Sequence, residues 1–483
     1  MGLGATARGL VAYGVLLALA WLWCLYSRRK LVRPRPVLRV VVVGVLLQLG
    51  LGLFILRTPW GRALFSGLNH AVLALLAYTN DGTRFLVGDL VDSRFTVALN
   101  VLPTVIFFSA LVGALYHVGL MQRVVGGMSW VMRRAMGLSG AETLPAAANI
   151  FIGPTEAPLL VKPYLASMSA PQLFSVMVAG FATVSGGILG AYVGLLRDVF
   201  PDIAGHLLAA SVMNAPISLV VARLLLPAET PSPALSVGLA NGAVASASTP
   251  STAPGSTAPE STALESDVPE ARGPDGENAE AVLHADAAPT ETPLAQPPPG
   301  EADAAANLVD AVATGARDGL MLALNIAAML LAFIAFVALF DGILLALQQG
   351  LGRLLGFVPT AFGLRDILAW CFYPVGWLLA ATPAEALTVA SLLGQKMALN
   401  ELIAYRALAD VMTTPAALSA PTLLAVTYAL CSFANFGTIA IQIGGLGTLA
   451  PGQRATVARL GLRGMLGGTL AALLSAALVL VLT

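Results

Sequence analysis

The feature that most constrains this chain is a recurring series of long apolar runs. A transmembrane helix needs about 17 to 25 predominantly apolar residues, and only 11% of the residues here are charged, against about 25% in soluble domains. Because only helices and closed barrels satisfy their backbone hydrogen bonds in lipid, runs of this length predict an all-α polytopic membrane protein. The runs lie at residues 10–26, 37–56, 97–120, 173–196, 204–226, 319–347 and 465–482.

Several functional classes are excluded by what the sequence lacks. It contains no G-x-x-x-x-G-K-[ST] and no H-E-x-x-H motif, which argues against an ATP-driven motor and an intramembrane metalloprotease. Its three cysteines have neither metal-binding nor disulfide spacing. The net charge is zero, so no nucleic-acid partner is expected, and the indicated partner is the lipid bilayer. We therefore expect a membrane protein that is not an enzyme.

Basic residues predict how the chain threads the membrane, because cytoplasmic loops collect Lys and Arg. The first run ends in the basic stretch SRRKLVRPRPVLR without a signal-peptide cleavage site, so it is expected to remain as a helix. Basic residues also lie in 121–137, an amphipathic cytoplasmic helix, and in 451–464 before the last run. All three agree with a multi-pass protein of the cell inner (plasma) membrane, with both termini outside. The polar segment 57–94 is expected along the outer interface.

Residues 228–305 interrupt the hydrophobic pattern. They are rich in Ala, Pro, Ser, Thr, Glu and Asp and nearly lack aromatic residues, a composition that cannot bury enough apolar surface to fold. We expect a disordered cytoplasmic linker that acts as a tether, with a regulatory tail as the alternative.

On either side of this linker the chain repeats one plan. A segment interrupted near a glutamate is followed by an apolar span broken by small and polar residues. Paired interrupted segments of this kind indicate the binding site of a transporter. The segments are GPTEAP (153–158) and FATVSGGILG (181–190) in the first half, and KMALNELIAY (396–405) and CSFANFGTIAIQIGGLG (431–447) in the second.

The two glutamates, Glu156 and Glu401, carry a high free-energy cost in broken apolar segments of a membrane protein. A carboxylate at the bilayer centre costs roughly 2.5–3.5 kcal/mol on insertion scales, and a broken helix adds unpaired backbone groups. We expect that a polar ligand with hydroxyl or amine donors supplies the missing partners. The alternative is a buried ion pair of each glutamate with Lys162 or Lys396.

The broken segments also offer oxygen ligands and an aromatic ring. Free carbonyls at broken helices can hold a cation, and a cage of Asn149, the Ile152 carbonyl, Thr183 and the Val184 carbonyl suits Na⁺ better than Ca²⁺ or Mg²⁺, which favour carboxylates. The alternative for these side chains is interhelical hydrogen bonding. Phe433 is placed to stack on a planar ring while Asn435 and Thr438 bond its substituents, although plain packing of Phe433 is also open.

Four motifs together resemble a known family. In order and spacing, they are similar to the signatures of the concentrative nucleoside transporters, from about residue 40 to the end apart from the linker. The motifs are GPTEAPLLVKPYL, MNAPISLVVARLLLPAET, GQKMALNELIAY and CSFANFGTIAIQIGGLGTLAP.

The resemblance implies a fold. It predicts a homotrimer whose protomer has eight transmembrane helices, two oppositely oriented re-entrant hairpins (about 143–170 and 367–417), broken spans (172–197 and 421–447) and interfacial helices. An inverted-repeat transport domain would move like an elevator against a scaffold built from the first three spans and the span at 318–346. The expected divisions are scaffold helices with the outer interfacial segment (1–120), the first half of the transport domain (121–227), the linker (228–305), a scaffold span (306–347) and the second half of the transport domain (348–483).

The resemblance also implies roles for single residues. Thr155 and Glu156 would bind the nucleobase, Ile188 would line the base side, and Phe433 would pack against the nucleoside. The ribose hydroxyls would be held by Glu401, Asn435 and Thr438, and the coupling Na⁺ by Asn149, Ile152, Thr183 and Val184.

The sequence departs from the family pattern at three of these positions or their neighbours. Residue 154 usually carries a glutamine that contacts the base, whereas Pro154 offers neither a side-chain hydrogen bond nor an N–H. Base selectivity is therefore expected to be shifted or relaxed. Thr183 and Thr438 replace serines and keep the hydroxyl.

The predicted function is secondary active symport that imports nucleosides, driven by a Na⁺ gradient. One alternative is H⁺ coupling, with Glu156 or Glu401 carrying the proton. An alternative of another class is a nucleoside-gated channel or receptor.

Overall fold

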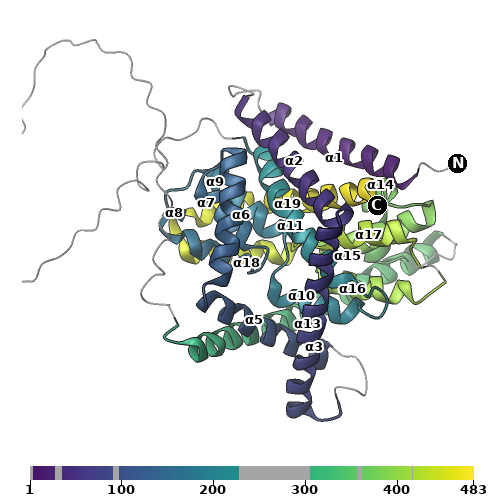
Figure 1. The fold of residues 1–483 in the computed structure, drawn as a ribbon. Helices are drawn as coiled ribbons and strands as arrows, with labels where there is room; N and C mark the ends of the chain where they lie inside the picture. The colour runs from purple at the N-terminus through teal and green to yellow at the C-terminus, as the bar shows by residue number, and fades with distance from the viewer. Residues whose placement is uncertain (1–3, 28–34, 91–96, 228–304, 356–361, 416) are drawn as a thin grey trace, which may run out of the picture. The chain divides into compact units, whose positions relative to one another are not determined.

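The computed structural model describes residues 4–27, 35–90, 97–227, 305–355, 362–415 and 417–483. Throughout these ranges the regular elements are helices (Figure 1). They are α1 (Ala5–Ser27), α2 (Arg35–Arg57), α3 (Pro59–Val87), the π-helix η1 (Val97–Val101), α5 (Leu102–His117), α6 (Leu120–Met136), α7 (Gly140–Ala148), the 3₁₀ helix η2 (Ala157–Val161), α8 (Lys162–Leu165), α9 (Ala170–Ala182), α10 (Gly186–Leu196), α11 (Ile203–Leu225), α13 (Leu308–Leu355), α14 (Leu364–Leu379), α15 (Pro383–Ala398), α16 (Glu401–Met412), α17 (Ala420–Leu430), α18 (Phe436–Leu449), η3 (Pro451–Gln453) and α19 (Arg454–Leu482).

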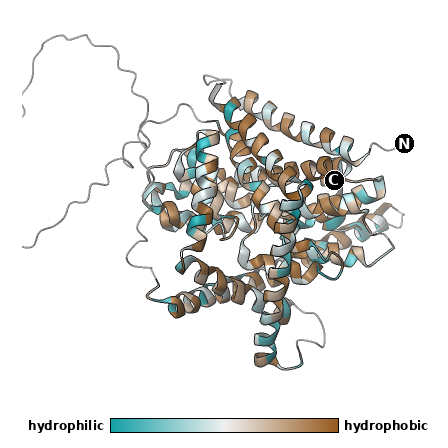
Figure 2. Cartoon of the chain, in the orientation of Figure 1, coloured by the Kyte–Doolittle hydropathy of each residue, from teal (hydrophilic) through white to brown (hydrophobic). Residues whose placement is uncertain are grey.

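Most of the predicted apolar runs form helices long enough to cross a bilayer. Figure 2 shows hydrophobic residues along most of these helices and hydrophilic residues at the free end of α3. The prediction of a polytopic all-α membrane protein is confirmed, while the count of eight spans stays a prediction. By length and composition the spanning candidates are Ala5–Tyr26, Val37–Arg57, Ala98–His117, Ala170–Leu196, Ile203–Leu225, Leu308–Leu355 and Pro451–Leu482, with shorter apolar helices at Ala420–Leu430 and Phe436–Leu449.

The core is formed by α11 and α19, which pack against the broken helices of both halves. In Figure 1, α7 and α9 lie on one side of α11 and α19, and α15 and α16 lie on the other. Contacts join α19 to both α9 and α17, and α11 to both as well. Because the same two helices support both breaks, the two halves of the repeat are held in one packed unit.

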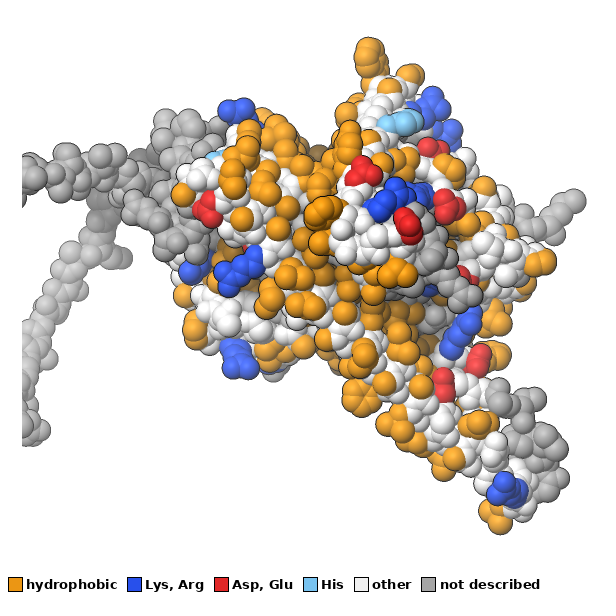
Figure 3. All heavy atoms as spheres, turned by 90° about the horizontal axis from the view of Figure 1, so that it is seen from below, with side chains coloured by type: hydrophobic (Ala, Val, Ile, Leu, Met, Phe, Trp, Pro, Cys, Tyr) orange, Lys and Arg blue, Asp and Glu red, His pale blue; other side chains and the backbone are white. Residues whose placement is uncertain are grey.

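A second group of helices, α5 and α13, packs closely through glycines. A methyl group at Gly315 would lie 2.7 Å from the Ser109 carbonyl oxygen, and one at Gly319 would lie 2.8 Å from the Ile106 Cα atom. Small residues at such crossings let two backbones approach each other. On the outside, α13 leaves apolar side chains such as Leu331 exposed, and Figure 3 shows hydrophobic side chains over much of the face seen from below.

The packing of α1 and α2 bears on the predicted scaffold. Both helices pack mainly against α11 and α19, whereas α5 packs mainly against α13 and α10. The packing therefore favours a division in which α5 and α13 stand apart and α1 and α2 go with the core. The domain boundaries given above stay a prediction, and the linker at 228–304 lies outside the described residues, as does most of the basic stretch after α1.

Each predicted hairpin region contains helices joined by a short connection. In the first, α7 is followed by the turn 149–156, η2 and α8. In the second, α15 and α16 meet at Leu399 and Asn400, and α14 is a separate helix that packs along α15. The predicted range 367–417 therefore holds a helix in addition to the hairpin. The amphipathic segment 121–137 forms α6, as expected.

Candidate nucleoside and cation site

Each half of the molecule contains one broken helix pair. Between α9 and α10, Thr183 and Ser185 have extended backbones with φ −116° and −72°. Between α17 and α18, Asn435 is extended and caps α18, since its side-chain oxygen accepts a hydrogen bond from the Thr438 N–H at 2.9 Å. A helix end leaves carbonyl and N–H groups without helical partners, so both breaks expose backbone polar groups inside the protein.

One buried amide joins the two breaks. The Nδ2 group of Asn214, in α11, donates to the carbonyl oxygens of Ala182 at 2.7 Å and Cys431 at 3.0 Å. Its Oδ1 atom accepts from the hydroxyl of Ser475 in α19, which in turn accepts from the amide of Gln48 in α2. Because this chain of bonds ends at both helix breaks, α2, α11 and α19 fix the breaks relative to each other.

The second half presents a fixed carboxylate. Glu401, at the start of α16, is 3% exposed and accepts hydrogen bonds from the Tyr192 hydroxyl at 2.7 Å and the Asn435 amide at 3.0 Å. Thr438 donates its hydroxyl to Asn435 Oδ1 at 3.0 Å. Ile188 lies one helical turn before Tyr192 and so shares its face of α10. Four of the predicted substrate residues, Ile188, Glu401, Asn435 and Thr438, thus lie together.

The ion-pair alternative for the glutamates is wrong. The Lys396 ammonium, 2% exposed, donates to the Ala429 carbonyl at 2.8 Å and to the Ser432 hydroxyl. It occupies the second helix break, and Lys162 is exposed. Within the described ranges, the ion pairs are Arg197–Asp198, Arg223–Glu142 and Arg406–Asp410.

The turn of the first hairpin lies against the first break. The Gly186 N–H, at the start of α10, donates to the Phe151 carbonyl at 2.8 Å. This bond brings the predicted cation ligands Asn149 and Ile152 of the turn beside Thr183 and Val184 of the break. Phe433, of the other break, donates its N–H to the Thr183 carbonyl at 3.3 Å, so both breaks border this region.

Asn149 is the most unusual of these residues. It is 1% exposed, yet neither its Oδ1 nor its Nδ2 atom has a hydrogen-bond partner among the described residues. Buried polar groups are nearly always paired, and an unpaired one indicates a ligand site, a strained site or another functional role. Thr183 is equally buried, and because its hydroxyl donates to the Ala179 carbonyl at 3.0 Å, its own oxygen still offers lone pairs to a cation.

The remaining predicted residues of the turn are Thr155 and Glu156. Thr155 packs on α18, where a methyl group at Gly445 would lie 3.1 Å from its Cγ2 atom. The Glu156 side chain is exposed, and it folds over its own turn, since a methyl group at Gly153 would clash with its Oε2 atom. Among the described residues, the side-chain partners of the Glu401 carboxylate are Tyr192 and Asn435, and Glu156 is not one of them.

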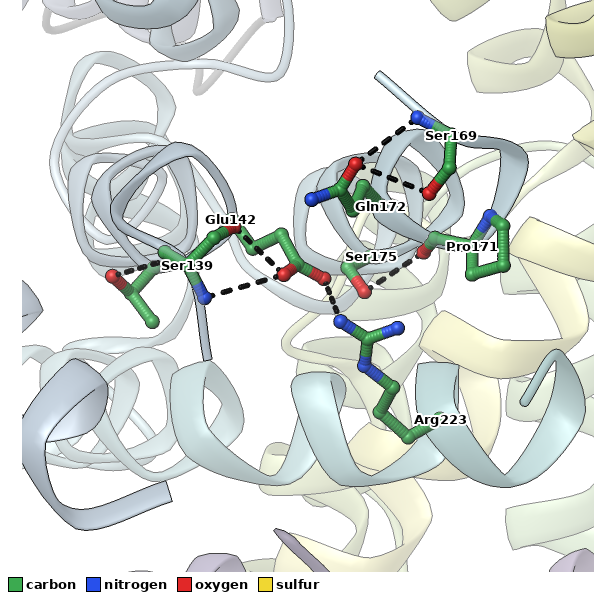
Figure 4. Close-up of polar contacts among 8 residues, drawn as sticks. Ser139, Glu142, Ser169, Pro171, Gln172, Ser175 and Arg223 are labelled. Carbon is green, nitrogen blue, oxygen red and sulfur yellow. Dashed lines mark hydrogen bonds and ion pairs between the residues drawn. The ribbon is translucent and has the colours of Figure 1, made fainter. Parts of the chain in front are cut away.

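Different polar interactions hold the bases of the two predicted hairpins. In the first, shown in Figure 4, Glu142 bonds the Ser139 hydroxyl and pairs with Arg223 of α11 at 2.5 Å. In the second, Glu385 accepts from the Ser419 N–H and the Thr422 hydroxyl, both at 2.8 Å. Burial raises the pKa of the Glu385 carboxyl, but these hydrogen bonds outweigh it and the pKa lies below its ordinary value.

Sequence reasoning missed two residues of this region. Tyr192 bonds Glu401, and Asn214 joins the breaks. For Asn214 the signal available was a polar group inside a span that is otherwise apolar, whereas a tyrosine in such a span is compatible with plain packing. Asn214 also lies within one of the four family motifs, MNAPISLVVARLLLPAET.

Comparisons with known proteins agree with this arrangement. Family models match three stretches: "Na+ dependent nucleoside transporter N-terminus" over residues 11–90, "Nucleoside recognition" over 98–198, and "Na+ dependent nucleoside transporter C-terminus" over 206–479. The last alone covers more than half of the chain.

Similar proteins are found in bacteria and in animals. The uncharacterized transporter YutK of Bacillus subtilis is 36% identical over 97% of this chain and 98% of the relative. An uncharacterized transporter of Haemophilus influenzae is 34% identical over 96% and 94%. Sodium/nucleoside cotransporter 1 of Rattus norvegicus is 33% identical over 91% of this chain and 59% of the relative.

Solved structures of the transporter CNTnw are also similar. Its inward-facing, substrate-bound state superposes with a TM-score of 0.76 at 31% identity, covering 99% of this chain and 98% of that one. An outward-facing state of the same protein gives a TM-score of 0.76, covering 99% of each chain. With matches along nearly its whole length, the chain belongs to the concentrative, Na⁺-dependent nucleoside transporter family, and it is a multi-pass membrane transporter that couples nucleoside transport to Na⁺ rather than an enzyme.

Proposed function

We propose that this protein imports nucleosides by symport and holds them between the first hairpin turn and the two helix breaks. The observation that carries the proposal is the Glu401 carboxylate, which is buried and receives its hydrogen bonds from Tyr192 and Asn435, whereas the nearby Lys396 ammonium donates to Ala429 and Ser432. A carboxylate oxygen has lone pairs beyond the one bond that it accepts here. Glu401, with Asn435 and Thr438, is therefore suited to accept from and donate to ribose hydroxyls.

The nucleobase side of the proposed site is formed by the first half. Ile188 offers an apolar surface on the same face of α10 as Tyr192, and Phe433 is a partly exposed ring in the second break. Thr155 and the exposed Glu156 carboxylate supply polar groups at the turn. An apolar lining with few polar groups is the usual composition of a small-molecule site.

The cation travels with the nucleoside in this proposal. Asn149 Oδ1, the Thr183 hydroxyl and the carbonyls of Ile152 and Val184 would bind Na⁺, and the partnerless amide of Asn149 supports this assignment. Since the cation ligands come from both the turn and the break, bound Na⁺ would hold these segments together in the geometry that receives the nucleoside. Coupling is reciprocal, so the nucleoside should tighten Na⁺ binding by the same factor.

We further propose an elevator movement of the core against α5 and α13. The surface between them is built for close sliding contact, because a methyl group at Gly187 in α10 would lie 2.8 Å from the Ser109 hydroxyl of α5. Similarity to CNTnw in both inward-facing and outward-facing states supports a transporter that populates both.

The proposed surroundings are the cell inner (plasma) membrane, with both termini outside and three copies in one assembly. Basic residues on α6, namely Arg123, Arg133 and Arg134, support a cytoplasmic position for that helix. The exposed apolar surface of α13 supports contact with lipid or with a second copy. Mass measurement in detergent tests the trimer, which predicts three times the 49.6 kDa of one chain.

Proteoliposomes test the transport proposal. With Na⁺ outside and none inside, labelled uridine should accumulate above its outside concentration, and an ionophore that collapses the Na⁺ gradient should abolish the accumulation. Accumulation driven only by a pH gradient would support H⁺ coupling instead. Equilibration of the label without accumulation under either gradient would support a nucleoside-gated channel and would overturn the proposal.

A further inference from the structure

Gln442 lies on the same face of α18 as two proposed substrate residues. Counting from Asn435, which caps the helix, Thr438 and Gln442 follow at spacings of three and four residues, and residues so spaced share one face of a helix. The Gln442 side chain is 1% exposed. An amide in the middle of an apolar helix is therefore buried directly beside the Asn435 and Thr438 pair.

Only half of this amide is satisfied. Its Nε2 group donates to the Met177 carbonyl of α9 at 3.0 Å, whereas its Oε1 atom has no partner among the described residues. The donated bond fixes the orientation of the amide and leaves the acceptor free. A buried acceptor without a partner is destabilising, which is the condition that a bound donor would relieve.

The amide lies against the turn of the first hairpin. A methyl group at Gly180 in α9 would be 2.9 Å from Gln442 Nε2 and 3.0 Å from Pro154 Cβ, so both residues pack over the same bare glycine. One turn further along α18, Gly445 contacts Thr155. Pro154 offers no N–H and no side-chain hydrogen bond. The polar group beside Pro154 is therefore the amide of Gln442, from α18.

We infer that Gln442 is a specificity-determining residue, whose Oε1 atom accepts a hydrogen bond from an exocyclic amino group of the nucleobase. The inference rests on the proposed function, since it assigns the base to the side of the site formed by residues 154–155. A site that hydrogen-bonds a substrate group discriminates strongly against an analogue that lacks it. The protein should therefore prefer nucleosides that carry the amino group over matched nucleosides without it.

The test compares two pairs of nucleosides in Na⁺-driven proteoliposomes. The pairs are adenosine with purine riboside, and cytidine with pyrimidin-2-one riboside, each differing in the exocyclic amino group alone. In the wild type the amino member of a transported pair should be favoured by about tenfold or more. Equal transport of both members by the wild type would overturn the inference without any variant.

The variant Gln442→Met keeps the length of the side chain and removes the acceptor. It should bring the two members of each pair within about twofold of each other, against a preference of about tenfold or more in the wild type, while the Na⁺ dependence of the remaining transport stays unchanged. A preference that survives in Gln442→Met, or an equal loss for both members, would show that Gln442 serves packing alone. If the wild type transported neither uridine nor any of the four nucleosides, the proposed function would fail with the inference; normal uptake without discrimination would defeat only the inference.

Discussion

The two helix breaks of this protein carry similar polar groups but differ in how those groups are satisfied. In the second half, Glu401 is already bonded by Tyr192 and Asn435, and Lys396 fills the break. In the first half, both polar atoms of Asn149 lack hydrogen-bond partners among the residues that the structure describes, and Glu156 is exposed. The second half is therefore organised in advance, while the first half depends on ligands to complete its hydrogen bonding. Preorganised groups lose less freedom when a ligand binds.

In our proposal, a cation accounts for the difference between the two breaks. The Lys396 ammonium donates to the carbonyl of Ala429 near the end of α17, and ammonium and Na⁺ both favour the negative end of a helix dipole. At the end of α9 in the first half, the corresponding charge is supplied in our proposal by Na⁺. One break would thus hold a cation that is part of the chain, and the other a cation that arrives and leaves.

The largest effect is expected at the organised carboxylate. Glu401→Gln removes the charged acceptor, and since hydrogen bonds to charged groups contribute about 1.5–3 kcal/mol each, the loss of two should reduce uptake by on the order of 100-fold. Initial rates of labelled uridine uptake measure this. The matched control is Asp198→Asn, an exposed acid, which should transport normally. Uptake by Glu401→Gln within a few fold of wild type would remove the ribose role.

The next largest effect is expected at the partnerless amide of the first break. Asn149→Ala should weaken activation by Na⁺ by about tenfold or more, because one oxygen ligand is lost. Unfolding measured with and without Na⁺ separates this from a packing role: a bound ligand raises stability by mass action, so Na⁺ should stabilise the wild type but hardly affect Asn149→Ala. Since the amide makes no hydrogen bond within the described part of the chain, the stability without Na⁺ should change little. A variant that is strongly destabilised yet keeps its Na⁺ response would contradict the cation assignment.

How far the sequence predicts this site depends on the kind of residue. Glu401, Asn435 and Thr438 could be predicted because polar groups in a broken apolar span need a reason to be there. Tyr192 could not, since a tyrosine in an apolar span is compatible with plain packing and its partner Glu401 lies 209 residues away. The hydrogen bonds of Lys396 could not be predicted either. The alternative of an ion pair with Glu401 was wrong, because the ammonium donates to the Ala429 carbonyl near the end of α17 instead.

The fold shows the same limit. Apolar length and periodicity predicted the helices and the amphipathic α6, whose features are local in sequence. They could not predict that α1 and α2 pack against α19 and α11, since the sequence of an apolar helix does not indicate which other helices it contacts. The predicted second hairpin, 367–417, came from the family resemblance and included most of α14. No local pattern marks α14 as a separate helix, because only residues 380–382 lie between it and α15.

An intermediate effect is expected from the lysine of the second break, and the chain offers a matched control. Lys396→Met removes the ammonium and leaves the Ala429 carbonyl without this donor, which should destabilise the protein by about 1–3 kcal/mol. If Na⁺ can replace the lost charge, the Na⁺ dependence of uptake should become steeper. Lys162→Met, at an exposed position, should change neither quantity. Wild-type stability and an unchanged Na⁺ dependence in Lys396→Met would show that the break needs no cation.

The smallest effect is expected at the base of the second hairpin, where Glu385 is held by neutral donors. Its pKa lies below the ordinary value in the folded protein, although burial alone would raise it, because the backbone N–H of Ser419 and the hydroxyl of Thr422 bond the carboxylate. A lowered folded-state pKa stabilises the protein above the unfolded-state pKa, and this contribution is lost as the pH falls through the folded-state value. Because Glu385 is only half-buried, we expect a contribution below about 1 kcal/mol.

Unfolding measured between about pH 6 and pH 3 should show a shallower pH dependence for Glu385→Gln than for wild type. Identical pH dependence of the two proteins would mean that the hydrogen bonds of Glu385 orient the hairpin without stabilising it.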